Sequence, residues 1–255
     1  MSFMFNPYPY DDPRPVNRVP MDEALAGEIV EGRREIAAGL ARELGELCGQ
    51  LGRGAVLAVD GYPTAEDAAL VRLVGRYLAD QGLRLEVTDM AALYRDPREI
   101  EALVAEHLPE DLDDDPVLLF GRIFHGGLTD LLDPDKAADL SRRLAQPGPA
   151  DAVRLVRGCG AGIEAIRTHC DRVVYLDVTP KEAVLAIKNG GYRNLGDDRD
   201  RPYKETMRRC YYVDFEVCSR LRGELLRAGQ VDYYLAAGNP DRMQMLPRAV
   251  FEAAC

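Results

Sequence analysis

Two aspartates stand where strand-like runs of the sequence end, and carboxylates at such positions can do acid–base chemistry or hold a metal. Asp60 follows the apolar run 55–59, and Asp89 follows the run 83–88. If both runs are strands of one parallel sheet, their carboxyl ends meet at the edge where α/β proteins bind ligands. The two carboxylates could then hold Mg²⁺ or accept a proton from a hydroxyl. Each could equally cap the helix that follows, and both interpretations stay open.

The segments just beyond the predicted strands supply further candidates. The same rule selects 122–127, 158–162 and 177–179, with Tyr62, Tyr94, Arg95 and Arg122 as candidate substrate-binding residues. His125 lies in the stretch GRIFHGG, where its imidazole could act as acid, base or phosphate donor. A lone histidine can also serve structure only, so this alternative is kept.

The turn after the first predicted strand lacks the residues of an ATP phosphate loop. That loop reads G-x-x-x-x-G-K-[ST], with backbone amides and a lysine around the phosphates. Residues 61–68 read GYPTAEDA, so Gly61 keeps the first glycine while Glu66 and Asp67 replace the second glycine and the lysine. Each carboxylate near a triphosphate would repel it by about 1 kcal/mol or more. The sequence therefore argues against ordinary ATP binding here.

A basic segment follows the clearest predicted strand, 172–178. Residues 187–209 read IKNGGYRNLGDDRDRPYKETMRR, in a chain of formal net charge −11. Arginines on a glycine-bearing mobile loop are suited to closing over phosphate oxygens. The predicted phosphate-binding residues of this loop are Lys188, Arg193, Arg199 and Arg201. The interleaved aspartates at 197, 198 and 200 offer an alternative, in which the arginines pair within a solvated loop.

A glycine-rich turn precedes another predicted helix. Residues 158–162 read GCGAG, and the amides at a helix start can receive an anion. Together with Gly61, Gly158 and Gly160 are therefore predicted to contact phosphate.

The composition excludes several classes of protein. With 255 residues, 47% of them hydrophobic, the chain can bury a large core and is not disordered. Its 43 acidic against 32 basic side chains argue against nucleic acid or anionic membranes as partners. The N-terminus lacks a signal-peptide pattern, so we expect a cytoplasmic protein. The six cysteines form no C-x-x-C pair and the three histidines are scattered, so we expect reduced thiols and no protein-built metal centre.

Hydrophobic patterning places these residues on an α/β fold. Strand-like runs at 55–60, 83–89, 116–121, 150–158, 172–178 and 231–237 alternate with helical stretches. This alternation predicts three layers, with helices on both faces of a mostly parallel sheet. Residues 21–51 have the spacing of one long amphipathic helix, and the tail from 240 that of a short helix. We therefore divide the chain into an N-terminal arm and helix, 1–52, and an α/β domain, 53–255. The arm, residues 1–20, could pack on the domain or on a partner chain, or it could be a frayed terminus.

In the order of these pieces, residues 53–205 resemble the uridine kinase-like branch of the P-loop kinases. AVLAVDGYP is similar to the first strand and turn of that family, and RVVYLDVTPKEAVLAIKNGGYRN to a later strand, helix and arginine-bearing lid. The resemblance implies that Asp89 and Tyr94 lie beside an acceptor hydroxyl. Mg²⁺ is then the expected cofactor, and ATP is doubtful because the loop's Gly-Lys-Ser is missing.

Nearly the whole chain also resembles the kinase-like segment that precedes the cupin domain in some bacterial type I phosphomannose isomerase-like proteins. FNPYPYDDPRPVN, VDGYP and MRRCYYVDFEVCSRLRGELL carry this resemblance. The cupin and its metal ligands have no counterpart here, so metal-dependent isomerisation by this chain alone is not expected. The resemblance implies an isomerase partner, and a homodimer is the other interaction considered.

Three functions stay open on this basis. The first is a phosphotransferase-like enzyme on a small polyhydroxy or phosphorylated metabolite, with Asp89 as base, Asp60 as metal ligand or substrate anchor, and the basic loop as lid. The second is a non-catalytic pseudokinase module that binds a sugar phosphate and docks on an isomerase. The third is an isomerase or lyase that reuses the scaffold without a triphosphate.

Overall fold

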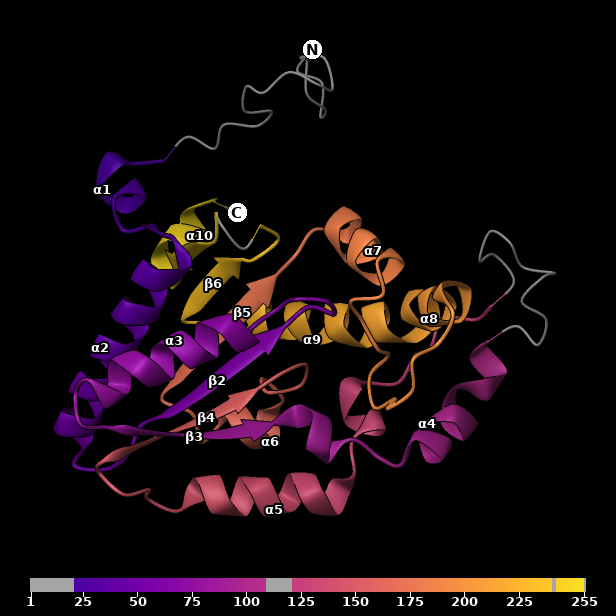
Figure 1. Cartoon of the computed structure of the whole chain (residues 1–255), viewed down its shortest axis with the longest axis horizontal. Coiled ribbons are helices and arrows are strands. Elements are labelled where there is room, and N and C mark those ends of the chain that lie inside the picture. Colours follow the sequence, from indigo (N-terminus) through magenta and orange to yellow (C-terminus); the bar gives the residue numbers. More distant parts are fainter. Residues whose placement is uncertain (1–20, 109–120, 240–241, 255) are drawn as a thin grey trace, which may run out of the picture.

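The computed structural model describes residues 21–108, 121–239 and 242–254 (Figure 1). The predicted N-terminal arm and nearly all of the predicted strand at 116–121 lie outside the described residues. Within the described part, none of the helices combines the length and the apolar surface needed to cross a membrane.

A seven-stranded sheet forms the centre of the described structure. In spatial order its strands are β1 (Val30–Glu31), β7 (Gln244–Pro247), β6 (Tyr233–Ala236), β5 (Arg172–Asp177), β2 (Val56–Gly61), β4 (Ala152–Arg157) and β3 (Arg84–Asp89). The strands from β6 to β3 are parallel, and β7 and β1 add an antiparallel edge. All six residues of β2 are buried, as expected for a short apolar run covered on both faces. The predicted mostly parallel sheet is confirmed.

Helices cover both faces of the sheet, which confirms the three-layer prediction. They are α1 (Glu23–Ala26), α2 (Arg33–Leu51), α3 (Ala68–Ala79), α4 (Pro97–Val104), α5 (Pro134–Ala145), α6 (Glu164–Arg167), α7 (Pro180–Lys188), α8 (Tyr203–Arg209), α9 (Phe215–Arg227) and α10 (Arg248–Ala254). Because crossovers between parallel strands are right-handed, the step from β2 out to β3 places α3 on one face. The later steps run back across the sheet, so they place α5, α6 and α9 on the other face. α2 packs along α3 (Figure 1).

The two ends of the described chain differ from the sequence-based prediction. The single helix expected over 21–51 is interrupted, because β1 pairs with β7 and α2 begins only after Gly32, whose φ of +92° suits glycine. α2 is nevertheless part of the core, since its Ile36, Leu40 and Leu44 are buried. At the other end, part of the expected helix is the strand β7, because residues 244–247 complete the sheet beside β6 before α10 begins.

Candidate functional site

Two hollows of similar size lie among the segments that follow the carboxyl ends of the parallel strands, the edge at which α/β proteins bind ligands. The first, here the β3 hollow, measures about 830 Å³ and is lined by segments 89–92, 94–97 and 193–198, together with residues of α5 and of the turn after β4. The second, the β5 hollow, measures about 840 Å³ and is lined by the ends of β5 and β6 and the starts of α2 and α7. Between the turns after β4 and β2, the Cys159 thiol donates to the Gly61 carbonyl at 3.1 Å.

Asp89 ends β3 and lines the β3 hollow. One carboxylate oxygen accepts the Ala91 amide at 2.9 Å and so caps the short 3₁₀ helix Met90–Leu93. The other oxygen lies 3.7 Å from a guanidinium nitrogen of Arg157. The Asp89 side chain is 48% exposed, which leaves the carboxylate able to accept a hydrogen bond from a ligand. Capping and ligand binding are therefore compatible at this residue.

Asp60 lines neither hollow. Its side chain is 2% exposed and accepts the backbone amides of Gly61 at 2.7 Å, Gly160 at 3.1 Å and Gly162 at 2.7 Å. Burial raises the pKa of Asp60 to about 6, and the three amide hydrogen bonds act in the opposite direction. This carboxylate ties the turn after β4 to the end of β2, so Asp60 and Asp89 do not share one ligand-binding surface.

The glycine turn after β4 differs from the open anion cradle that its sequence predicts. Gly158 and Gly160 have φ values of +102° and +98°, so the turn does form. Its amides are occupied from within, because Gly160 donates to the Asp60 carboxylate and Gly158 to the Val59 carbonyl at 3.0 Å. The Gly61 amide likewise donates to Asp60. Of these three predicted phosphate-binding glycines, only Gly158 lines the β3 hollow.

The turn between β2 and α3 carries a partly buried ion pair at the start of α3. Asp67 stands at the N-terminus of α3, is 7% exposed, and accepts two hydrogen bonds from Arg157 at 2.9 and 2.5 Å. Burial raises the pKa of Asp67, and the Arg157 charge acts in the opposite direction. The positive end of the helix and the nearest guanidinium thus already face a carboxylate of the protein itself.

One wall of the β3 hollow forms where residues 93–95 run beside residues 131–133, joined by backbone hydrogen bonds of 2.9 and 3.0 Å. The Tyr94 side chain is buried, and its hydroxyl donates to the Cys159 carbonyl at 3.0 Å. Burial raises the pKa of this hydroxyl well above its ordinary value. Lys136, in the first turn of α5, donates to the Tyr94 carbonyl at 3.3 Å, which places an ammonium group at the hollow.

Lys136 is a lining residue that the sequence analysis missed. Asp133 and Pro134 before it mark only the start of a helix. Nothing local shows that this helix start lies beside Tyr94, which is 42 residues away. Arg95, selected by the strand-end rule, does line the hollow, and its Nε donates to the Asp130 carbonyl at 2.9 Å.

Among the predicted arginines, the basic loop gives Arg193 to the β3 hollow. The other two, Arg199 and Arg201, share the carboxylates of Asp197 and Glu101 and do not line it. These pairs correspond to the alternative in which the loop neutralises its own charge. Lys188 is exposed at the end of α7 and lines neither hollow.

The segment 192–195 is anchored by one buried carboxylate. Asp214 is 0% exposed and ends a π-helical turn between α8 and α9. Its Oδ2 accepts hydrogen bonds of 2.8–3.2 Å from the Tyr192 hydroxyl, the Asn194 side-chain amide and the Leu195 backbone amide. Burial raises the pKa of Asp214, against the effect of the Arg209 charge 3.6 Å away. The backbone on both sides of Arg193 is thus held in place where it lines the hollow.

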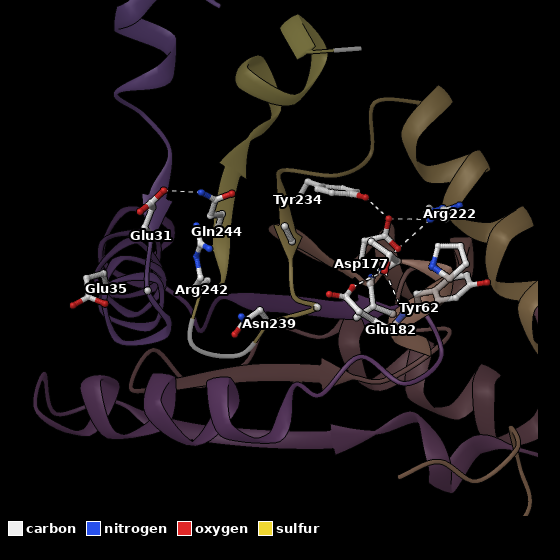
Figure 2. Close-up of a pocket in the computed structure, with 16 residues that line it drawn as sticks. Glu31, Glu35, Tyr62, Asp177, Glu182, Arg222, Tyr234, Asn239, Arg242 and Gln244 are labelled. Atoms are coloured by element: carbon white, nitrogen blue, oxygen red, sulfur yellow. Dashed lines mark hydrogen bonds and ion pairs between the residues drawn. The ribbon is translucent and has the colours of Figure 1, made fainter. Parts of the chain in front are cut away.

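The β5 hollow has a wall of interlocked polar side chains (Figure 2). Asp177 accepts hydrogen bonds from Arg222 at 2.9 and 3.0 Å and one from the Tyr234 hydroxyl. The Arg222 guanidinium also lies over the Tyr62 ring, 5.4 Å from its centroid. Tyr62, a predicted substrate-binding residue, therefore lines this hollow and not the one beside Asp89. The charged residues around it are Glu31, Glu35, Asp177, Glu182, Arg222 and Arg242, which makes the lining net acidic.

The remaining predicted residues, Arg122 and His125, are exposed and line neither hollow. Among the described residues, no three histidine, cysteine or acidic side chains gather as a metal centre would require.

The mostly parallel sheet, with helices on both faces, defines a three-layer α/β protein. A family model described as "Domain of unknown function (DUF8485)" matches residues 32–255, and the chain belongs to that family. No curated protein matches the chain in sequence.

Solved kinase structures match the chain at low identity. A possible uridine kinase from Bacillus stearothermophilus is 13% identical, with a TM-score of 0.41 over 77% of this chain and 98% of that one. Phosphoribulokinase from Rhodobacter spheroides is 10% identical, with a TM-score of 0.46 over 73% of each chain. A D-glycerate 3-kinase from Cryptococcus neoformans is 14% identical, with a TM-score of 0.44 over 72% of this chain and 87% of that one.

Proposed function

We propose that the chain binds a small polyhydroxy or phosphorylated metabolite in the β3 hollow and acts on it as a phosphotransferase-like enzyme of the nucleoside- or sugar-kinase type. The observation that carries the proposal is the meeting of Asp89, Lys136 and Arg193 on one hollow at the carboxyl edge of the sheet. A carboxylate can accept the proton of an attacking hydroxyl. Cationic side chains can bind phosphate oxygens through charge-assisted hydrogen bonds.

In this proposal Asp89 is the proton acceptor. The ligand hydroxyl gives its proton to the carboxylate as its oxygen forms a bond to the donor's terminal phosphorus. The bond between that phosphorus and the donor's bridging oxygen breaks, and the donor leaves with the electron pair of that bond. The half-exposed Asp89 side chain can reach a ligand. In this proposal the phosphoryl donor binds away from the turn between β2 and α3, a choice supported by the Asp67–Arg157 pair at the start of α3. If Mg²⁺ enters with the donor, Asp89 is the predicted carboxylate that remains open to it.

A second function is favoured by the pairing of Asp67 with Arg157. A chain that fills its own phosphate position can serve as a non-catalytic module, which binds a sugar phosphate and docks on an isomerase. The same pairing is compatible with isomerase or lyase chemistry on a phosphorylated metabolite, which needs no triphosphate. Measured turnover of the bound metabolite distinguishes these functions, because a non-catalytic module gives none and an isomerase or lyase needs no phosphoryl donor.

A thermal-shift panel is the first test. We expect phosphorylated sugars or polyols to raise the unfolding temperature, because a ligand stabilises the state that binds it. Further stabilisation by ATP·Mg²⁺ would favour the enzyme, whereas stabilisation by a phosphosugar alone would favour the non-catalytic module. Stabilisation by ATP·Mg²⁺ alone would contradict the assignment of the ligand to the β3 hollow.

The second test compares Asp89→Asn with the wild type on the stabilising compound. Loss of a proton acceptor should lower kcat/KM about 10²- to 10⁴-fold and leave the binding constant within a few-fold. Asp198→Asn is the matched control, since Asp198 lines the same hollow but is 79% exposed. Equal kcat/KM in Asp89→Asn and wild type would remove Asp89 from the chemistry, and binding without turnover in the wild type would favour the module.

A further inference from the structure

Much of the acidic charge around the β3 hollow already has partners in the protein. Asp96 and Asp133 accept the first amides of α4 and α5, Asp197 pairs with Arg199 and Arg201, and Asp89 lies 3.7 Å from the Arg157 guanidinium, which it shares with Asp67. The other two lining carboxylates, Glu99 and Asp198, are exposed to solvent. Water screens such exposed charges strongly. The lining can therefore accept an anion despite its number of aspartates.

Lys136 brings a positive charge that the described structure does not neutralise. Its only hydrogen bond among the described residues runs to the Tyr94 carbonyl, a neutral acceptor, and no carboxylate there lies within ion-pair distance of it. That bond uses one of the three donors of the ammonium group and fixes its position. The other two donors can bind an anion in the hollow.

Arg193 brings a second positive charge, and its ion pair with Asp200 is exposed enough for a ligand anion to replace Asp200. Its ion pair with Asp200 measures 2.7 Å, but the two side chains are 56% and 85% exposed. Exposed pairs of this kind contribute little to stability. The backbone on either side of Arg193 is anchored, since Asp214 holds both Tyr192 and Asn194. The guanidinium can thus turn from Asp200 to a ligand without any movement of the loop.

We infer that Lys136 and Arg193 are the anion-binding pair of the β3 hollow, and that the ligand there is a phosphomonoester whose phosphate lies between these two side chains. The inference rests on the proposed function only for the choice of hollow. It narrows the substrate class from a polyhydroxy or phosphorylated compound to one that already carries a phosphate. It also assigns no phosphate contact to Arg199, Arg201 or Lys188.

Inorganic phosphate is the probe for this inference. Its dissociation constant is measured from the unfolding temperature of the full chain against phosphate concentration, with sodium chloride holding the ionic strength constant. We expect Lys136→Gln and Arg193→Gln each to raise that constant tenfold or more. The matched controls, Lys188→Gln and Arg227→Gln, make the same chemical changes at exposed positions at the ends of α7 and α9, outside the hollow, and should stay within twofold of the wild type.

Three results would overturn the inference. They are no phosphate binding by the wild type, unchanged binding in both hollow variants, or equal losses in the hollow variants and the controls, which would indicate a general effect of net charge. Asp200→Asn gives an independent check, because removal of the competing carboxylate should tighten phosphate binding severalfold. A looser constant in that variant would also contradict the inference.

The test separates this inference from the proposed function. Asp89→Asn should still bind phosphate, because Asp89 is a proton acceptor and repels an anion. If phosphate binding is unchanged in the Lys136 and Arg193 variants while Asp89→Asn abolishes turnover, the anion-binding pair is wrong and the proposed function stands. If phosphate binding depends on the pair while Asp89→Asn keeps full turnover, the anion-binding pair stands and the role proposed for Asp89 is wrong.

Discussion

Asp60→Asn should remove a pH dependence of stability that the buried carboxylate imposes. In the folded protein burial raises the pKa of Asp60 to about 6, whereas an ordinary aspartate has a pKa of 3.8. As the pH falls through 6, the folded state takes up a proton that the unfolded chain still lacks. The stability from this group is therefore fully present below pH 3.8 and is lost as the pH rises through 6.

The size of the effect follows from the two pKa values. A pKa of about 6 against 3.8 corresponds to about 3 kcal/mol between the fully protonated and fully ionised limits. Between pH 7.5 and pH 5 only part of this range is crossed. The free energy of unfolding should rise by about 1–2 kcal/mol from this group over that interval.

The assay is urea unfolding of the wild type and of Asp60→Asn at pH 5, 6 and 7.5. Asparagine cannot ionise, so the difference in unfolding free energy, wild type minus variant, should be about 1–2 kcal/mol larger at pH 5 than at pH 7.5. The variant also lacks an oxygen that accepts a glycine amide, but that loss does not vary with pH. Asp198→Asn, at a 79% exposed position, should give a nearly flat difference.

Parallel curves for the wild type and Asp60→Asn, within about 0.5 kcal/mol over the whole range, would refute this reasoning. They would mean that the three glycine amides offset the burial of the carboxylate completely. The position would then be an ordinary ionised cap and not a group strained by burial.

Two further predictions concern the framework of the β3 hollow. Gly162→Ala should lower the free energy of unfolding by about 1–3 kcal/mol, because its Cβ would lie 2.8 Å from a Leu225 methyl carbon. Gly49→Ala in α2 is the control, since its Cβ would meet nothing within 4 Å. This variant should be neutral or stabilising by up to about 1 kcal/mol. Urea unfolding checks both, and equal losses would contradict the packing argument. Asp214→Ala should speed amide hydrogen exchange at 192–195 at least tenfold, since alanine has no oxygen to accept the bonds that anchor this segment. Exchange at the wild-type rate would show that Asp214 is not the anchor.

The central part of the fold was predictable because its signals are local. The runs that form β2 and β5 are apolar and short, and such runs occur in buried parallel strands whatever surrounds them. β1 and β7 were missed because each is only two or four residues long. Their stability comes from pairing with each other and with β6, and no pattern within either segment reports that pairing.

The candidate site was predictable where the strand-end rule suffices. That rule selects Asp89, Tyr94, Arg95 and Gly158, and all four line the β3 hollow. It places Asp60 there as well, because the rule cannot distinguish an open strand end from one whose carboxylate folds onto a glycine turn.

The sequence could not predict the roles of residues whose partners lie far away along the chain. Lys136 reaches the hollow only because the start of α5 lies beside Tyr94. In the basic loop, composition shows arginines and aspartates together but not their pairing. The structure shows that Arg201 faces Asp197 while Arg193 lines the hollow.

In the function proposed above, the β3 hollow holds a phosphorylated metabolite between its cations and Asp89. The most direct measurement is a crystal structure of the full chain with the sugar or polyol phosphate that stabilises it most. We expect the phosphate at Lys136 and Arg193, with a ligand hydroxyl within hydrogen-bond distance of Asp89. A phosphate in the β5 hollow, or a ligand that leaves Asp89 facing only water, would contradict this expectation.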